Sequence, residues 1–168
     1  MKPKLLILDT SVLCVYLNIP GKETCDGEIQ LTHESAIAII QEKQQAGWQF
    51  VLPVACAIET GNHIAQCGGN RYDLATQLVS LIKQAIAGES PWIIFSANLD
   101  IWKPDNLGWL DDWASHAAAK LSIADRTISF IADDYSTKGY EVEIFTCDEQ
   151  LKAHQPAQPK LPLPRRRR

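Results

Sequence analysis

The chain lacks long apolar runs and paired cysteine motifs. No run approaches the roughly 20 residues that a membrane-spanning helix needs. The start, Met1-Lys2-Pro3-Lys4, leads into a strand-length run without the cleavage site of a signal peptide. The five cysteines are an odd number without Cys-x-x-Cys spacing, which argues against a disulfide framework and a zinc ribbon. We therefore expect a cytoplasmic protein whose cysteines are reduced thiols, most of them in the core.

Basic residues are scarce in the body of the chain. There are 16 basic side chains against 20 acidic ones, and the basic ones include the consecutive Arg165, Arg166, Arg167 and Arg168. Without these four, 12 basic side chains remain against 20 acidic ones, a net charge of -8. Generic affinity for nucleic acid comes from lysine and arginine side chains that neutralise phosphates. To bind nucleic acid, such an acidic body would therefore need a metal ion, a local basic patch, the tail or a partner. The four arginines are either a solubilising terminus or an anchor for phosphates or a partner.

Length and composition fit one compact domain, since 168 residues with 46% hydrophobic and 21% charged side chains are ordinary for a globular protein. Strand-like runs alternate with helical patterns, which predicts a three-layer α/β/α fold with a mostly parallel central sheet. After residue 153 the sequence becomes proline-rich, so a domain of residues 1–153 is expected to end in a flexible tail, 154–168. The expected strands are 4–8, 48–52, 92–95 and 141–145, and the expected helices are 11–18, 32–47, 53–67, 71–87, 105–121, 122–138 and 149–153.

Two aspartates follow apolar, strand-like runs. Asp9 comes directly after the run that ends at Leu8, and Asp148 comes shortly after the run that ends at Phe145. Open α/β sheets bind ligands at the carboxyl ends of their strands, so both aspartates are candidates for a site at that edge. Each also has a simpler explanation as the N-cap of the short helix that follows it.

Glu59 lies in the expected helix 53–67 and is the third candidate. It is about 100° round the helix from the apolar stripe, so it borders the core. Asn62 and His63, three and four residues further on, share its face. A solvated surface glutamate is an equal alternative, and His63 is expected to pack or hydrogen-bond, or else to contact metal-bound water or phosphate. The residues of this helix predicted to be buried are Val54, Ile58, Gly61 and Ala65.

Asp125 is the fourth candidate and lies three residues after Ser122, a spacing typical of a capping box at a helix start. Its face continues through Ser129 and Ala132, whose small side chains leave room beside a carboxylate. The core stripe of the same helix is expected to be Ala124, Ile128, Ile131 and Tyr135.

The four carboxylates indicate more as a set than singly. Carboxylates gathered at one sheet edge repel one another unless a cation holds them, and hard oxygen ligands favour Mg²⁺ or Mn²⁺. Such ions activate water and stabilise the leaving oxygen of a phosphodiester, so a nuclease is the leading hypothesis. Ser11 and Thr146 would supply supporting hydroxyls at the same strand ends.

These residues resemble a PIN domain, the metal-dependent nuclease fold of many prokaryotic toxins and of RNA-processing proteins. The resemblance covers about residues 4–153 and depends on order and approximate spacing. The motifs are Leu8-Asp9-Thr10-Ser11-Val12-Leu13, Leu52-Pro53-Val54 leading to Glu59, Leu121-Ser122-Ile123-Ala124-Asp125, and Phe145-Thr146-Cys147-Asp148.

The resemblance implies that Asp9, Glu59, Asp125 and Asp148 surround one or two Mg²⁺ or Mn²⁺ ions and hydrolyse RNA to 5′-phosphate and 3′-hydroxyl ends. It also implies a homodimer and, for a toxin, an antitoxin or another regulatory protein as partner. The stretches 19–31 and 62–111 are longer than a minimal toxin domain requires.

Three alternatives stay open. The chain is either a catalytic ribonuclease, a DNA-directed nuclease, or a non-catalytic PIN-like binding or scaffold module. A phosphatase of the haloacid dehalogenase type is disfavoured because the expected Asp-x-Asp has Ser11 in its second acidic position. The tryptophans of the longer stretch are expected in the core or a dimer interface rather than as base-stacking platforms, and they are Trp92, Trp102, Trp109 and Trp113.

Overall fold

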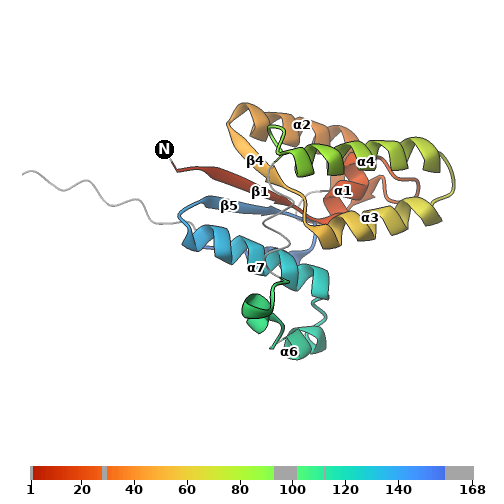
Figure 1. Cartoon of the computed structure of the whole chain (residues 1–168). Helices are drawn as coiled ribbons and strands as arrows, with labels where there is room; N and C mark the ends of the chain where they lie inside the picture. Colours follow the sequence, from red (N-terminus) through yellow and green to blue (C-terminus); the bar gives the residue numbers. More distant parts are fainter. Residues whose placement is uncertain (1, 28–29, 93–101, 112, 158–168) are drawn as a thin grey trace, which may run out of the picture.

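The computed structural model describes residues 2–27, 30–92, 102–111 and 113–157 (Figure 1). Its centre is a parallel sheet with the strand order β4-β1-β5. The central strand is completely buried from Leu5 to Leu8, because helices cover both faces of the sheet. The strands are β1 (Lys4–Leu8), β4 (Trp48–Val51) and β5 (Glu141–Phe145).

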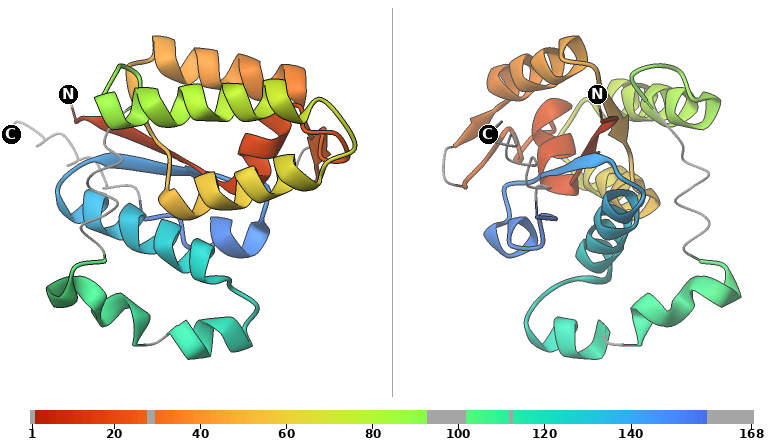
Figure 2. Two further views of the ribbon diagram at one scale, coloured as in Figure 1. Left: turned by 45° about the vertical axis from the view of Figure 1, so that its right-hand side comes forward. Right: turned by 90° about the vertical axis from the view of Figure 1, so that its left-hand side faces the viewer.

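Helices flank this sheet on both sides. In Figures 1 and 2, α2 and α4 lie on one side of the strands and α7 lies on the other. The expected mixed α/β architecture with a parallel, helix-covered sheet is therefore confirmed at that level. None of the helices in the described part of the chain has both the length and the apolar character that crossing a bilayer requires. The helices are α1 (Thr10–Tyr16), α2 (His33–Gln45), α3 (Val54–Gln66), α4 (Arg71–Ala87), α6 (Trp113–Ala118), α7 (Ile123–Thr137) and α8 (Glu149–Lys152).

Local signals set most helix ends. Thr32 begins α2 with a reciprocal capping box to Ser35. Gly47 follows the end of α2 with a φ of +77°, a left-handed conformation that a residue without a Cβ adopts readily. The stripe expected to face the core from α7 is buried throughout, and it consists of Ala124, Ile128, Ile131 and Tyr135.

The sheet is extended beyond β4 by one bridge between Phe50 and Trp92. Trp92, the first residue of the strand expected over 92–95, thus pairs with β4. The other residues of that expected strand, 93–95, lie outside the described residues. Trp92 and Trp109 are buried, as expected of core side chains, whereas Trp102 is exposed. The Trp92 ring meets Phe50 edge to face, with ring centroids 5.5 Å apart.

The prediction of a single helix over 105–121 is wrong. The chain instead forms a 3-10 helix, η1 (Pro104–Leu110), followed by the short helix α6. Gly108 lowers helix propensity within this stretch. The buried ring of Trp109 packs against Phe130 and Trp102. Ring packing with α7 therefore determines the path of this segment more than its helical periodicity does.

The prediction of which residues of α3 are buried is also wrong. Ile58 is 60% exposed and Ala65 is exposed. Most of the buried positions lie one residue before the expected ones, and they face the helices that α3 contacts, α1, α4 and α7. The residues that face the core are Cys56, Ala57, Thr60 and Ile64.

The stretch 19–31 and the next residue contain an antiparallel hairpin of β2 (Thr24–Cys25) and β3 (Leu31–Thr32). Cys25 of this hairpin is joined to Cys147 by a disulfide, with the two Cα atoms 6.1 Å apart. The expectation that all cysteines are reduced thiols is therefore wrong for this pair and right for Cys14, Cys56 and Cys67, which are free and buried. The two bonded residues are separated by 122 positions, so no sequence motif predicts their contact.

Gln155 completes the outer edge of β5. Its Nε2 donates to the Val142 carbonyl over 2.5 Å, and its Oε1 accepts from the Ile144 N–H over 2.7 Å. The side-chain amide thus replaces one residue of a neighbouring parallel strand and satisfies two edge groups. The folded body consequently continues past the expected boundary at residue 153 to Gln155 at least.

Replacing Gln155 with alanine should lower the free energy of unfolding by about 1–3 kcal/mol, because two partly buried backbone groups lose their partner. Urea unfolding followed by circular dichroism measures this change. The control Gln150→Ala removes an exposed side chain from α8 and should change stability by less than about 0.5 kcal/mol. Equal stabilities of the Gln155→Ala variant and the parent would show that water replaces the amide without loss.

Candidate functional site

The carboxyl ends of β1 and β5 meet at one edge of the sheet, and the candidate site lies there. From β1 the chain passes to β4 on one side and returns later to β5 on the other side. Connections that leave a central strand in opposite directions open a crevice at its carboxyl end. Asp9 directly follows β1, and Asp148 lies three residues after β5.

Asp9 joins the ends of the two strands. Asp9 as a whole is buried, with 7% of its surface exposed. One oxygen, Oδ1, accepts from the Thr10 N–H over 2.6 Å. The other, Oδ2, accepts from the Ser11 hydroxyl over 2.6 Å and from the Thr146 hydroxyl over 2.8 Å. Ser11 and Thr146, predicted as supporting hydroxyls, thus both contact Asp9.

The loop after β5 is tied into the same network. The N–H of Asp148 donates to the Thr146 hydroxyl over 2.9 Å, and the N–H of Cys147 donates to the Ser11 hydroxyl over 3.3 Å. The Asp148 side chain is exposed. Its Oδ1 accepts from the N–H groups of Gln150 and Leu151, at 2.7 and 3.3 Å, and so caps α8.

Glu59 is connected to this network through Thr10. The Thr10 hydroxyl donates to Glu59 Oε2 over 2.8 Å, while its N–H is bonded to Asp9. Thr10 therefore links α3 to the end of β1, a role that the sequence analysis did not assign to it. The available signal was a hydroxyl residue next to a strand-end aspartate.

Asp125 takes part in a capping box and also interacts electrostatically with two of the other carboxylates. Its Oδ2 accepts from the Ser122 N–H over 2.8 Å, and its own N–H donates to the Ser122 hydroxyl over 3.1 Å. Burial is the main cause that raises the pKa of Asp125, and the negative charges of Asp9 and Asp148 raise it further, against the hydrogen bonds with Ser122. The structure therefore links Asp125 electrostatically to Asp9 and Asp148.

The donor chemistry suits a hard cation, but the spacing is wide. Each of three carboxylates has one oxygen that accepts no hydrogen bond within the described part of the chain: Glu59 Oε1, Asp125 Oδ1 and Asp148 Oδ2. These are the oxygen donors that Mg²⁺ and Mn²⁺ prefer. However, no group of three or more His, Cys, Asp or Glu residues in the described ranges is close enough to form a complete ligand set. An ion here would depend on one or two carboxylates at a time, with water completing its shell.

Of the remaining supporting candidates, His63 is half-buried and Asn62 is exposed. Burial lowers the pKa of His63, and the charge of Lys22 lowers it further, whereas Glu59 raises it. His63 thus lies within electrostatic reach of both Glu59 and Lys22. Lys22 is a basic residue near His63 and Cys14 that the sequence analysis did not single out. Arg165, Arg166, Arg167 and Arg168 lie outside the described residues.

A pocket of about 490 Å³ lies beside the carboxylates rather than at them. One wall includes Gly27 and Leu31 of the hairpin region, and the opposite wall includes Thr146, Cys147 and other residues of β5 and α8. None of the four candidate carboxylates lines it. The acidic residues that line it are Glu143 and Glu149. The candidate site is therefore the hydrogen-bonded network of Asp9, and the pocket is a separate feature beside it.

Comparison of the chain with protein-family models, with curated proteins and with solved structures finds no match.

The effect of Asp125 on stability should depend on pH. Because its folded-state pKa is raised from 3.8, the unfolded chain ionises first as the pH rises, and stability is lost through that window. Asp125→Asn keeps the acceptor for Ser122 but cannot ionise. Its stability relative to the parent should therefore increase as the pH rises from about 4 to neutrality, measured by urea unfolding in the presence of a chelator.

Asp73→Asn is the matched control, since Asp73 is an exposed aspartate at the equivalent third position of α4. It should show no such gain. A constant difference between Asp125→Asn and the parent across this pH range would mean that burial and the neighbouring charges do not act on Asp125.

Proposed function

We propose that the chain is a Mg²⁺- or Mn²⁺-dependent ribonuclease of the PIN type, with Asp9, Glu59, Asp125 and Asp148 as its metal-binding carboxylates. The observation that carries this proposal is the buried Asp9 carboxylate, which holds hydroxyls from the ends of both β1 and β5. Glu59 is connected to Asp9 by hydrogen bonds through Thr10. The negative charge of Asp9 contributes to the raised pKa of Asp125.

Capping accounts for part of the hydrogen bonding of Asp9, Asp125 and Asp148, but it does not explain the whole arrangement. An N-cap needs only a hydrogen bond to a nearby backbone N–H, yet Asp9 also accepts from Thr146, which is 137 positions away. Glu59 lies within α3 and caps no helix. Raising the pKa of Asp125 by neighbouring carboxylates is unfavourable for an ionised group, so a structural role alone gives no reason to gather them.

In the proposed ribonuclease, the carboxylates would bind the metal ion, and Lys22 and His63 would contact the substrate. Asp9 is held in one orientation by three donors. The other three carboxylates each have one oxygen that accepts no hydrogen bond from the residues that the structure describes. A bound divalent ion would supply positive charge at the phosphodiester and a water molecule of lowered pKa. His63 lies within electrostatic reach of Glu59 and Lys22, so on this side Lys22 would contact phosphate oxygens and His63 would hydrogen-bond to a substrate.

A non-catalytic PIN-like binding module is the second candidate. The observation that favours it is the absence, in the described part of the chain, of three ligands close enough for one ion. Cleavage by the purified chain separates the two, because a binding module retains RNA without hydrolysing it.

Cleavage of RNA should require Mn²⁺ or Mg²⁺, and Asp9→Asn or Asp148→Asn should each lower the rate on the order of a hundredfold or more. The amide is nearly isosteric but lacks the charge that holds a hard cation. A fluorescent RNA assay measures the rate, and calorimetric Mn²⁺ titration measures ion binding. Single-stranded DNA of the same sequence, assayed in parallel, distinguishes a ribonuclease from a DNA-directed enzyme.

Glu149→Gln is the matched control, because it removes one negative charge next to Asp148 from an exposed side chain. Its rate should stay within about threefold of the parent, as surface charges contribute little. Undiminished cleavage in excess chelator, or by the Asp9→Asn variant, would contradict the assignment of the chemistry.

Removal of Arg165 to Arg168 should weaken RNA binding and flatten its salt dependence, because each arginine that neutralises a phosphate releases counterions. The slope of log K against log salt should become shallower by up to ~3 to 4 units. Fluorescence anisotropy titrations at several salt concentrations measure it. Replacement of the four arginines by lysines keeps the charge and should keep the slope. An unchanged slope after truncation would leave solubility or partner binding as the role of the tail.

A further inference from the structure

The five cysteines fall into two groups. Cys14, Cys56 and Cys67 are free and buried, with exposures of 2%, 0% and 6%. Cys25 and Cys147 are partly exposed, and Cys147 lines the pocket beside the candidate site. Small thiols and disulfides from solution therefore have access to the second group and little access to the first.

Cys147 belongs to a segment that the fold already holds in place. It follows β5, its N–H is bonded to the Ser11 hydroxyl, and the next turn is anchored by the fully buried Leu151. The Cα atoms of Cys25 and Cys147 are 6.1 Å apart, within the range that a disulfide spans.

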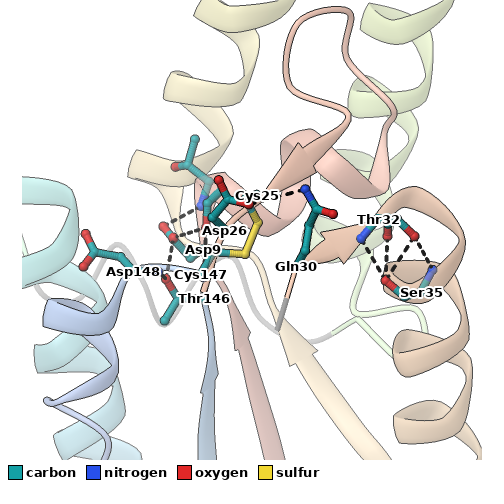
Figure 3. Close-up of a disulfide and its surroundings, with 11 residues drawn as sticks. Asp9, Cys25, Asp26, Gln30, Thr32, Ser35, Thr146, Cys147 and Asp148 are labelled. Atoms are coloured by element: carbon teal, nitrogen blue, oxygen red, sulfur yellow. Dashed lines mark hydrogen bonds between the residues drawn. A yellow bond between two sulfur atoms is a disulfide. The ribbon is translucent and has the colours of Figure 1, made fainter. Parts of the chain in front are cut away.

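Cys25 pairs with Leu31 of β3 and packs against the edge of the core, but the residues around it are solvent-exposed. Thr24, Asp26, Gly27 and Gln30 are all exposed. The hydrogen bond from Gln30 to Asp26, at 3.4 Å, is internal to the hairpin. The disulfide consequently connects an exposed hairpin tip to a firmly packed loop (Figure 3).

The backbone of the tip lies directly on this loop. A Cβ atom at Gly27 would be 3.4 Å from the Cys147 carbonyl oxygen and 3.7 Å from its Cα. In the view of Figure 3, the disulfide lies on one side of Thr146 and the Asp148 side chain extends on the other side. The tip thus forms one wall of the pocket, and the loop that connects Thr146 to Asp148 forms part of the other.

We infer that Cys25 and Cys147 are a reversible dithiol–disulfide site whose oxidised state pins the paired strands β2 and β3 against the loop between β5 and α8. This inference does not rest on metal binding or on RNA hydrolysis. The reduced state frees the tip and opens the pocket on that side, while the sheet and its helices stay folded.

The oxidant is a small-molecule disulfide, with oxidised glutathione as the representative. One cysteine thiolate attacks a sulfur of glutathione disulfide, which forms a mixed disulfide and releases one glutathione thiolate. The second cysteine thiolate then attacks the protein sulfur of that mixed disulfide and releases the second glutathione. The two cysteines lose two protons and two electrons, and glutathione disulfide becomes two molecules of reduced glutathione.

The buried thiols should stay out of this exchange. Burial raises the pKa of Cys14 to about 11, although Lys22 lowers it, and burial raises the pKa of Cys56 well above its ordinary value. A thiol that is both inaccessible and protonated is a poor nucleophile. Oxidation is therefore expected to be selective for the surface pair.

The test uses the full chain, equilibrated in mixtures of reduced and oxidised glutathione without denaturant. After acid quenching, denaturation and alkylation, peptide mass spectrometry determines the state of each cysteine. Under oxidising conditions we expect Cys25 bonded to Cys147 and three alkylated thiols, Cys14, Cys56 and Cys67. Under reducing conditions all five cysteines should be alkylated, and reoxidation should restore the pair.

Amide hydrogen exchange measures the pinning. Reduction should accelerate exchange in residues 24–27 and 30–32 by about tenfold or more, and it should leave β1 and β5 unchanged. Cys25→Ser should exchange at the fast rate in both buffers. Cys67→Ser is the matched control, since it removes a free thiol and keeps a donor for the Gly69 carbonyl, and it should behave like the parent.

Three results would overturn the inference. In the first, Cys25 and Cys147 stay unpaired in excess oxidised glutathione. In the second, the pair forms but cannot be reduced without unfolding the chain. In the third, the hairpin exchanges equally fast in the oxidised and the reduced protein.

Discussion

The carboxylate of Asp9 is the interaction on which this sheet edge depends. A buried negative charge is unfavourable unless several donors compensate it, and here the donors come from Thr10, Ser11 and Thr146. The first two belong to the start of α1, and the third follows β5. A single side chain therefore fixes how the two strands end relative to each other. Glu59 is connected to it through Thr10, whose N–H donates to Asp9 and whose hydroxyl donates to Glu59. Asp148 is connected to it through the Thr146 hydroxyl, which accepts from the Asp148 N–H and donates to Asp9.

Helix starts make this concentration of negative charge tolerable. Asp9, Asp125 and Asp148 each precede or open a helix, and their oxygens accept backbone N–H groups there. The positive end of a helix dipole favours a carboxylate at that place. The same bonds occupy only part of each carboxylate, because a carboxylate offers about four acceptor sites. Capping and cation binding are thus compatible uses of one residue, and the proposed ribonuclease would draw on both.

The hairpin of β2 and β3 and the Gln155 side chain both lie near the outer edge of β5, but they work differently. Gln155 satisfies the backbone of the strand in its middle, so this contact belongs to the stability of the fold. The hairpin is attached to the loop after the strand by a covalent bond that solvent thiols can reach. One contact is permanent, while the other responds to the redox state of the surroundings, so the pocket between them has one fixed wall and one adjustable wall.

The sequence by itself determined the elements and their local ends. The apolar runs of β1 and β5, the buried stripe of α7 and the caps at Ser122 and Asp148 depend on residues within a few positions of one another, and the patterns predicted them. The tertiary structure decided the rotation of α3, the break between η1 and α6, the bonds from Thr10 to Glu59 and from Thr146 to Asp9, and the Cys25–Cys147 disulfide. These features join segments that are dozens of residues apart or depend on which helices pack against one another. Periodicity and capping signals extend over one or two turns and carry no information about such distances.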